Sequence, residues 1–266
     1  MANIENSKKQ HEPIKTISFA GEKVPSYIKR KAKEVGIDVV ELSENPQVII
    51  SYGGDGTFLG CLRDFEQPIL PMRRNEDYRK CRIHTPWNIF EDMKSGRCTI
   101  YNLPQIVCEA NGIMGESFVR GYNDITLRPV DPRSAIRFKV KIGSSDYGSE
   151  IVGDGIVACT PFGSSAYFRS ITRSIIRGGW GLAFNNSCEQ NDHLFLSDQI
   201  VKIEITRGPA CIFGDNSEII NLDEDQKELR FYLDNDFNRQ CLSLDSLFCK
   251  ECQEKETGRP AGWRHS

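Results

Sequence analysis

A buried strand that runs directly into a glycine-rich turn constrains this chain more than any other feature. Residues 48–52 read VIISY, a continuous and largely β-branched run typical of parallel strands that are buried on both faces. The sequence GGDGT follows at residues 53–57, and residues 57–65 are predicted to form a helix. A strand, a glycine turn and a helix in this order indicate an α/β fold with a parallel sheet.

The segments on either side of this turn continue the alternation of strands and helices. Further strands are predicted at residues 14–20, 39–42 and 69–72. A helix is predicted at residues 25–35, with a proline near its start and Gly36 at its end. The sequence therefore predicts a Rossmann-like α/β domain at residues 14–100, after a disordered start at residues 1–13.

After about residue 100, the hydrophobic pattern changes to strict alternation. In residues 135–142, Ile136, Phe138 and Val140 fall on one side and basic residues on the other, which indicates half-buried antiparallel strands. Similar segments occur at residues 119–127, 200–205, 210–213 and 229–233, with one predicted helix at residues 164–177. We expect a second, mostly antiparallel β domain at residues 101–244 and a loose polar tail at residues 245–266.

Composition limits the partners that such a chain can have. The 266 residues carry a net charge of −3, so the basic excess typical of nucleic-acid-binding proteins is missing. No apolar run approaches the roughly 20 residues of a membrane helix, and the polar N-terminus shows no secretory signal. We therefore expect a cytoplasmic protein that binds neither nucleic acid nor membrane.

Ten cysteines are scattered along the chain, and most lie singly in apolar segments, as Cys159 does. Buried single cysteines behave as small hydrophobic residues, and in the cytosol they stay reduced. Only Cys249 and Cys252 have the spacing of metal ligands, and such a pair is at best half of a zinc site. No second half is visible, so no metal site made of protein side chains is predicted.

The glycine-rich turn at residues 53–57 has the properties of an anion site. Glycines let the backbone approach a ligand closely, and the N–H groups at a helix start attract phosphate. Asp55, at the centre of this turn, would repel phosphate unless it has a chemical role. It could accept a proton from an attacking hydroxyl, or hold Mg²⁺ through water. The alternative is an ordinary Asp-Gly turn.

Two further segments carry polar residues at strand and helix starts. Asn123 and Asp124 precede an alternating strand, where they could bind a ribose or an adenine edge, or simply form an Asx turn. Residues 153–167 read GDGIVACTPFGSSAY: a glycine turn, an apolar strand, and then small hydroxyl residues at a helix start. Tyr167 could stack on a flat ring there; the alternative is an ordinary capped helix.

Together these segments resemble the NAD kinase family. Residues 53–57 are similar to its GGDGT motif, which diacylglycerol, sphingosine and 6-phosphofructo kinases share. Asn123 and Asp124 resemble its Asn-Glu or Asn-Asp pair. Residues 153–167 resemble its GDGxxxxTPTGSTAY signature, which separates NAD kinases from the lipid kinases. Asp215-Asn216 resembles a late Asp-Gly of the family more weakly. The resemblance spans residues 14–244.

The resemblance implies that the ribose 2′-hydroxyl of NAD attacks the terminal phosphate of ATP or polyphosphate. Asp55 matches the family's proton acceptor. The resemblance assigns nucleotide binding to Gly54, Gly56, Thr57, Asn123, Asp124, Asp154, Ser165, Ala166, Tyr167 and Ser170. It also implies a requirement for Mg²⁺ or another divalent cation, and a homodimer or homotetramer.

Two places depart from the family pattern. The glycine-rich segment expected after residue 70 is replaced by a stretch that contains Arg73 and Arg74, and Phe162 stands where the family has Thr or Ser. The arginines are either a solvated pair or additional phosphate ligands. Two other functions therefore stay open: a non-catalytic sensor of NAD(H) or a related nucleotide, and a kinase of another acceptor. Asp55 favours catalysis, because a sensor needs no base.

Overall fold

The computed structural model describes residues 12–72, 86–110, 118–189, 192–223 and 227–244. The described chain divides into two compact units. The first contains residues up to Asn102 together with those from Arg239 onward, and the second comprises Leu103–Asn238. The predicted tail lies outside the described residues, and so does nearly all of the predicted disordered start. The described residues also do not include Arg73, Arg74, Cys249 and Cys252.

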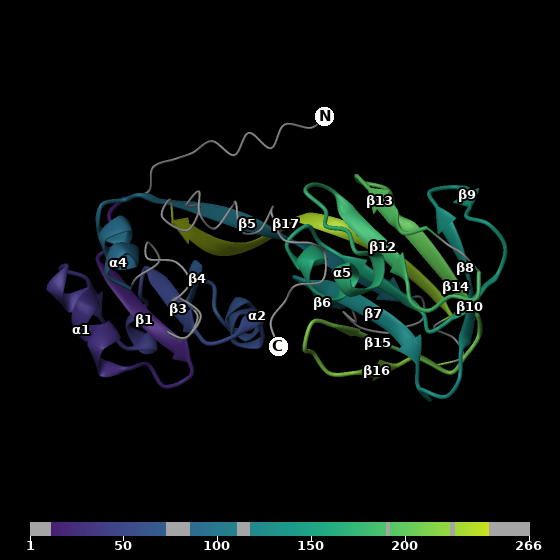
Figure 1. Cartoon of the computed structure of the whole chain (residues 1–266), viewed down its shortest axis with the longest axis horizontal. Helices are drawn as coiled ribbons and strands as arrows, with labels where there is room; N and C mark the ends of the chain where they lie inside the picture. Colours follow the sequence, from purple (N-terminus) through teal and green to yellow (C-terminus); the bar gives the residue numbers. More distant parts are fainter. Residues whose placement is uncertain (1–11, 73–85, 111–117, 190–191, 224–226, 245–266) are drawn as a thin grey trace. The chain divides into compact units, whose positions relative to one another are not determined.

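The first unit is built on a parallel sheet (Figure 1). Its elements are β1 (Thr16–Gly21), α1 (Ser26–Glu34), β2 (Asp38–Val39), a short 3-10 turn (Leu42–Glu44), β3 (Val48–Tyr52), α2 (Asp55–Asp64), β4 (Ile69–Met72) and α4 (Pro86–Lys94). The strand order is β2-β1-β3-β4, and every pair is parallel. The end of β17 (Glu228–Leu244) adds a further parallel strand beside β4, where Cys241 pairs with Ile69.

Helices cover both faces of this parallel sheet. Helices α1 and α4 lie on one side of the strands and α2 on the other (Figure 1). On the first side, Ile28 of α1 and Phe90 of α4 join Ile50 of β3 in one buried cluster. All five residues of β3 are buried, as a strand covered on both faces requires. None of the described helices is long and apolar enough to cross a membrane.

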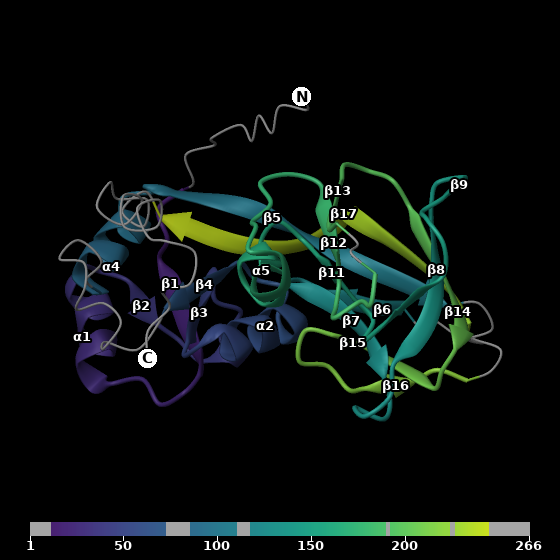
Figure 2. The same ribbon diagram turned by 45° about the vertical axis from the view of Figure 1, so that its right-hand side comes forward.

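The second unit is a sandwich of two largely antiparallel sheets (Figure 2). Its elements are most of β5 (Cys98–Ala110), β6 (Phe118–Gly121), β7 (Asp124–Pro129), β8 (Ile136–Ile142), β9 (Ser145–Asp146), β10 (Ile151–Gly153), β11 (Ile156–Cys159), a 3-10 turn (Gly163–Ser165), α5 (Tyr167–Thr172), β12 (Trp180–Phe184), β13 (Leu194–Leu196), β14 (Val201–Arg207), β15 (Ala210–Gly214), β16 (Ile220–Asn221) and most of β17. One sheet has the order β10-β8-β14-β17, with β5, β6 and β9 attached, and the other β13-β12-β11-β7-β15-β16.

The inner faces of the two sheets form one core. Phe138 and Phe231 from the first sheet and Trp180 and Leu182 from the second belong to a single buried cluster. Along β8 and β14, buried and exposed residues alternate, which is the pattern of strands with one face on a core and one in water. The predicted combination of a parallel α/β region and an antiparallel β region is confirmed.

Several local predictions differ from the structure. Residues 119–127 form two strands, β6 and β7, rather than one, because the chain turns at Tyr122 and Asn123. The helix predicted at residues 164–177 is reduced to α5, which ends where Arg173 takes a positive φ of 60°. Residues Arg239–Leu244 belong to the first unit, although the hydrophobic pattern had grouped them with the β domain. Local periodicity does not reveal which distant strand a segment will join.

Candidate functional site

The glycine turn of the first unit joins β3 directly to α2. Only Gly53 and Gly54 separate Tyr52 from Asp55, the first residue of the helix. The N–H of Gly53 donates to the carbonyl of Met72 over 3.0 Å, which ties the turn to the end of β4. Gly53 has φ +155°, and a Cβ there would collide with the hydroxyl oxygen of Thr57. The turn therefore requires glycine at position 53.

Thr57 packs into this turn. A Cβ at Gly21, where β1 ends, would collide with the methyl group of Thr57. The neighbouring Glu22 donates its N–H to the carbonyl of Tyr52 over 3.0 Å. The ends of β1, β3 and β4 thus meet around the half-buried Thr57 side chain, which holds the turn in place. This is the carboxyl edge of the parallel sheet, where α/β folds bind their ligands.

Gly54, Asp55 and Gly56 form the exposed part of the turn. Helix α2 makes its first internal hydrogen bond from Phe58 to the carbonyl of Gly54, over 3.2 Å. The amide groups before Phe58 therefore point toward the helix start, where the helix dipole favours negative charge. The same dipole stabilises the carboxylate of Asp55 in this first turn. Anion binding and an exposed carboxylate are thus combined in three residues.

In the second unit, one carboxylate holds the turn that precedes β7. Asp215 accepts hydrogen bonds from the backbone N–H groups of Tyr122 at 2.7 Å, Asn123 at 2.8 Å and Asp124 at 3.2 Å. Its own N–H donates to the carbonyl of Asp124 over 2.9 Å, and its φ of 47° lies in the left-handed region. Asp215 therefore fixes the backbone from which Asn123 and Asp124 project.

Thr160 connects this turn to the third sequence motif. Its hydroxyl donates to the carbonyl of Tyr122 over 2.5 Å, and its N–H donates to the carbonyl of Asn123 over 3.0 Å. The same hydroxyl accepts the N–H of Gly163 over 3.0 Å. A Cβ at Gly163 would collide with the backbone of Asn123, so the two segments touch. The structure thus brings residues 123–124 and 160–163 together.

Asp124 has a buried carboxyl group whose pKa differs from that of an exposed aspartate. Its side chain is 8% exposed, and within the described part of the chain no group donates a hydrogen bond to the carboxylate. Burial, and to a smaller degree the negative charge of Asp215, raise the pKa of Asp124 to about 7. A buried acid without a donor is available to hydrogen-bond a polar ligand.

The remaining predicted residues lie near the glycine turn before β11 and around α5. Asp154 accepts a hydrogen bond from the Asn186 side chain at 3.1 Å, and the Tyr167 hydroxyl accepts one from Asn185 at 3.1 Å. Tyr167 is exposed over 40% of its surface.

Ser165, Ala166 and Ser170 are exposed, and the hydroxyl of Ser170 donates to the carbonyl of Tyr167 over 2.7 Å. Phe162 is also exposed. Asp55, Gly54, Gly56 and Thr57 belong to the first unit, and every other predicted residue to the second.

Several curated NAD kinases have detectable sequence similarity to the chain. The NAD kinase of Limosilactobacillus reuteri subsp. reuteri is 25% identical over 209 residues, covering 75% of this chain and 72% of the relative. NAD kinase 2 of Oceanobacillus iheyensis is 24% identical over 221 residues, covering 76% and 79%. NAD kinase 2 of Bacillus licheniformis is 30% identical over 154 residues, covering 56% and 57%. No protein-family model matches the chain.

The same fold occurs in solved structures of an NAD kinase and an NADH kinase. An NAD kinase from Archaeoglobus fulgidus, solved in complex with ATP, aligns with a TM-score of 0.69 at 17% identity, covering 92% of this chain and 99% of that one. A yeast NADH kinase complexed with NADH aligns with a TM-score of 0.69 at 14% identity, covering 96% and 91%. The chain is thus similar to NAD kinases in sequence and shares their fold.

Sequence reasoning missed several residues that shape this region. Asn185 and Asn186 follow β12 in an ordinary-looking loop, and only the fold brings them to Tyr167 and Asp154. The sequence pointed to Asp215 only through the weak resemblance of Asp215-Asn216 to an Asp-Gly of the family. It did not indicate the three N–H groups that Asp215 binds, which lie more than 90 residues away. Such a contact has no local sequence pattern.

Replacing Gly53 with alanine should strain the turn. The positive φ and the collision with Thr57 should lower the free energy of unfolding by about 1–3 kcal/mol. Gly54→Ala is the matched control, because φ is −90° there and the space around its Cα is open. Its effect should stay within about 0.5 kcal/mol. Urea denaturation measures both, and equal effects would contradict the role of Gly53.

Removing the Asp215 carboxylate should destabilise the second unit. Asp215→Ala leaves three backbone N–H groups without their acceptor, and unmade bonds of this kind cost about 1–3 kcal/mol each. We expect a loss of about 3 kcal/mol or more in the free energy of unfolding. The control is Asp131→Ala, whose carboxylate pairs with Arg133 in an exposed turn and should matter much less. A wild-type denaturation midpoint for Asp215→Ala would refute the assignment.

Asp124 should make stability depend on pH. The folded protein keeps this proton up to about pH 7, whereas the unfolded chain loses it near pH 4. The folded state binds more protons in this window, so the contribution of Asp124 to stability should fall as pH rises from about 4 to about 7. Asp124→Asn should therefore gain stability relative to wild type across that window, as measured by thermal melts. Parallel pH curves for the two proteins would contradict the prediction.

Proposed function

We propose that this protein phosphorylates NAD at the 2′-hydroxyl of the adenosine ribose to give NADP, with ATP or another phosphoryl donor. The curated relatives named NAD kinase, the neighbouring structures with ATP and NADH, and the three sequence motifs all support this activity. The observation that carries the proposal is the exposed Asp55 carboxylate within the anion-binding start of α2. A carboxylate at such a place is explained by proton transfer during phosphoryl transfer.

In this proposal the first unit supplies the chemistry. Asp55 accepts the proton of the ribose 2′-hydroxyl as the oxygen attacks the terminal phosphorus of the donor. The backbone N–H groups of Gly54 and Gly56 bind phosphate oxygens and stabilise the charge that develops there. Thr57 keeps these groups in register by packing against Gly53. Positioning and electrostatics account for most of the rate enhancement in reactions of this class.

The second unit supplies the nucleotide contacts. Asn123 and Asp124 hold the adenosine part of NAD, with Asp215 and Thr160 fixing their backbone. Asp154 and Tyr167 contact the rest of NAD, in orientations supported by hydrogen bonds to Asn186 and Asn185. The exposed segment that contains Ser165, Ala166 and Ser170 completes this surface.

A divalent cation such as Mg²⁺ is part of the proposal, but it would be held mainly by the donor. Among the described residues, no group of three or more His, Cys, Asp or Glu side chains could hold a metal ion. Mg²⁺ commonly binds through substrate phosphates, one or two carboxylates and water, which is compatible with Asp55 as a single carboxylate. When bound, the cation would neutralise phosphate charge.

The proposal also covers the setting of the protein. We expect a cytoplasmic homodimer or homotetramer, as the resemblance implies. The described cysteines are free thiols, which is compatible with a reducing compartment. Light scattering after size-exclusion chromatography measures the oligomeric state.

Asp55→Asn tests the role of the carboxylate. The amide has the same shape but cannot accept the proton, so kcat should fall by about 10²–10⁴-fold while the KM for NAD changes little. Asp64→Asn is the matched control, because Asp64 is an exposed carboxylate at the other end of the same helix and pairs with its neighbour Arg63. Normal NADP formation by Asp55→Asn would exclude Asp55 as the base.

The same assay separates the proposed activity from its alternatives. The protein is incubated with NAD, Mg²⁺ and either ATP or polyphosphate, and NADP is quantified. Product formation supports the kinase and identifies its donor. Saturable binding of NAD without product would indicate a nucleotide sensor of the same fold. Neither binding nor product would indicate a kinase of another acceptor.

A further inference from the structure

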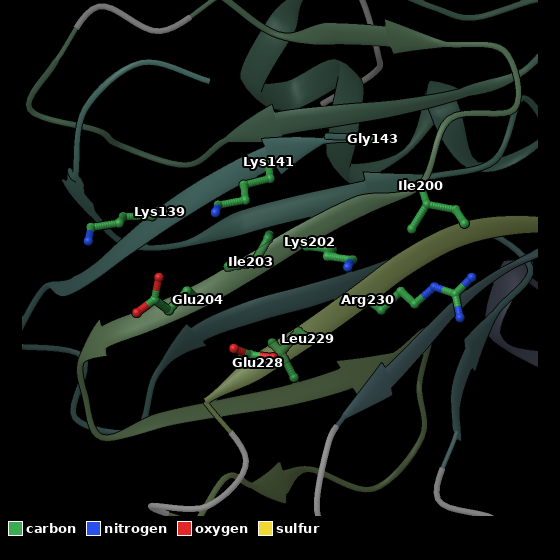
Figure 3. Close-up of a pocket in the computed structure, with 10 residues that line it drawn as sticks. All are labelled: Lys139, Lys141, Gly143, Ile200, Lys202, Ile203, Glu204, Glu228, Leu229 and Arg230. Atoms are coloured by element: carbon green, nitrogen blue, oxygen red, sulfur yellow. The ribbon is translucent and has the colours of Figure 1, made fainter. Parts of the chain in front are cut away.

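Three basic side chains form a row across adjacent strands on the exposed face of the second unit. The strand register places Lys202 of β14 directly opposite Lys141 of β8 on one side and Arg230 of β17 on the other. All three are exposed, because the intervening residues of these strands, such as Ile203, point into the core. Figure 3 shows the row running from Lys141 through Lys202 to Arg230. We call these three residues the cationic row.

This arrangement is electrostatically unfavourable by itself. Like charges directly opposite each other on neighbouring strands repel and destabilise a sheet. The outer members are partly compensated, since Lys141 lies 3.5 Å from Asp146 and Arg230 lies 3.2 Å from Glu109. Within the described part of the chain, Lys202 has no carboxylate partner. The centre of the row therefore carries an uncompensated positive charge between two other cations.

The cationic row borders a hollow of about 600 Å³. The hollow is lined by Lys139, Lys141, Gly143, Ile200, Lys202, Ile203, Glu204, Glu228, Leu229 and Arg230. Glu204 of β14 and Glu228 of β17 also lie directly opposite each other, two residues along each strand from Lys202 and Arg230. Figure 3 shows these two acids on the side of the hollow away from Gly143. The row next to the cationic row therefore consists of Lys139, Glu204 and Glu228, and its two acids stand side by side.

We propose that the cationic row is a binding site for a short linear oligophosphate, either free or as part of a nucleotide. The three cations span two strand spacings, about 10 Å, and a linear oligophosphate presents anionic oxygens along such a line. The guanidinium group of Arg and the ammonium group of Lys are common phosphate ligands in proteins. The bound anion would remove the repulsion between Lys141, Lys202 and Arg230.

The neighbouring acids limit what this site accepts. Glu204 and Glu228 would repel an anion that extends beyond the row, and the chain as a whole is acidic, with a net charge of −3. A long polyanion such as a nucleic acid is therefore disfavoured, and a short anion that lies along the row is favoured. The site is independent of the proposed kinase reaction, because none of its residues belongs to the segments that carry the proposed chemistry.

The test compares wild type with the double variant Lys141→Gln/Lys202→Gln, using inorganic tripolyphosphate, ATP and sulfate as probes. Calorimetry gives affinity and stoichiometry, and thermal melts give the change in stability at each anion concentration. Lys139→Gln is the matched control, because Lys139 lies on the same face but stands opposite Glu204 instead of another cation. NADP formation is measured in parallel to show that the variants leave the proposed active site intact.

We expect wild type to bind tripolyphosphate at a site that the double variant loses, with affinity reduced at least about tenfold for each cation removed. Lys139→Gln should change that affinity by less than about threefold, because its charge lies off the row and is screened by salt. Without anion, the double variant should be at least as stable as wild type, since two repelling charges are gone. With tripolyphosphate, wild type should gain thermal stability that the double variant does not.

The probes identify the source of the phosphate. Tighter binding of ATP than of tripolyphosphate at the row would indicate a nucleotide ligand, and an effect of tripolyphosphate alone would indicate an inorganic one. Two results would overturn the proposal: unchanged tripolyphosphate affinity in the double variant, or stabilisation of wild type by sulfate equal to that by tripolyphosphate. If wild type forms no NADP, the proposed function is wrong, but neither of these two results changes. The oligophosphate site and the proposed function are therefore tested independently.

Discussion

The hydrogen bonds that Asp215 accepts from three consecutive backbone N–H groups determine the geometry of the second unit's candidate site. Because the turn before β7 is held at these amides, the side chains of Asn123 and Asp124 leave a backbone that has little freedom. Thr160 then attaches the start of the third motif to the carbonyls of the same turn. Hydrogen bonds thereby hold together positions that lie more than 90 residues apart in the sequence.

Sequence reasoning was strongest where a local pattern determines structure. The buried run of β3 and the alternation of β8 appear with nearly the predicted bounds. A strand buried on both faces has a continuous apolar sequence, and a strand buried on one face has an alternating one. The glycine turn could likewise be predicted, and the positive φ of Gly53 gives the physical reason for a glycine there. The candidate residues were found through motifs, and the structure adds how each one is held.

Sequence reasoning was weakest where a distant partner decides the outcome. The predicted helix at residues 164–177 stops at Arg173, because the backbone turns into the left-handed region to begin the path toward β12. The return of residues 239–244 to the first unit depends on pairing with β4. The cationic row depends on the register of three strands, which places Lys141, Lys202 and Arg230 side by side from positions that look like ordinary solvated charges.

The ionisation of Asp124 has a consequence for the kind of ligand that this site selects. With a pKa of about 7, the carboxyl group exists near neutrality as a mixture of two forms. The neutral form offers both a donor and an acceptor, whereas the ionised form only accepts. A ligand that presents two donors favours the ionised form, so Asp124 releases a proton to solvent when this ligand binds. A ligand that presents an acceptor favours the neutral form, so Asp124 takes up a proton. Proton exchange on binding is therefore a chemical signature of which atoms the ligand places beside Asp124.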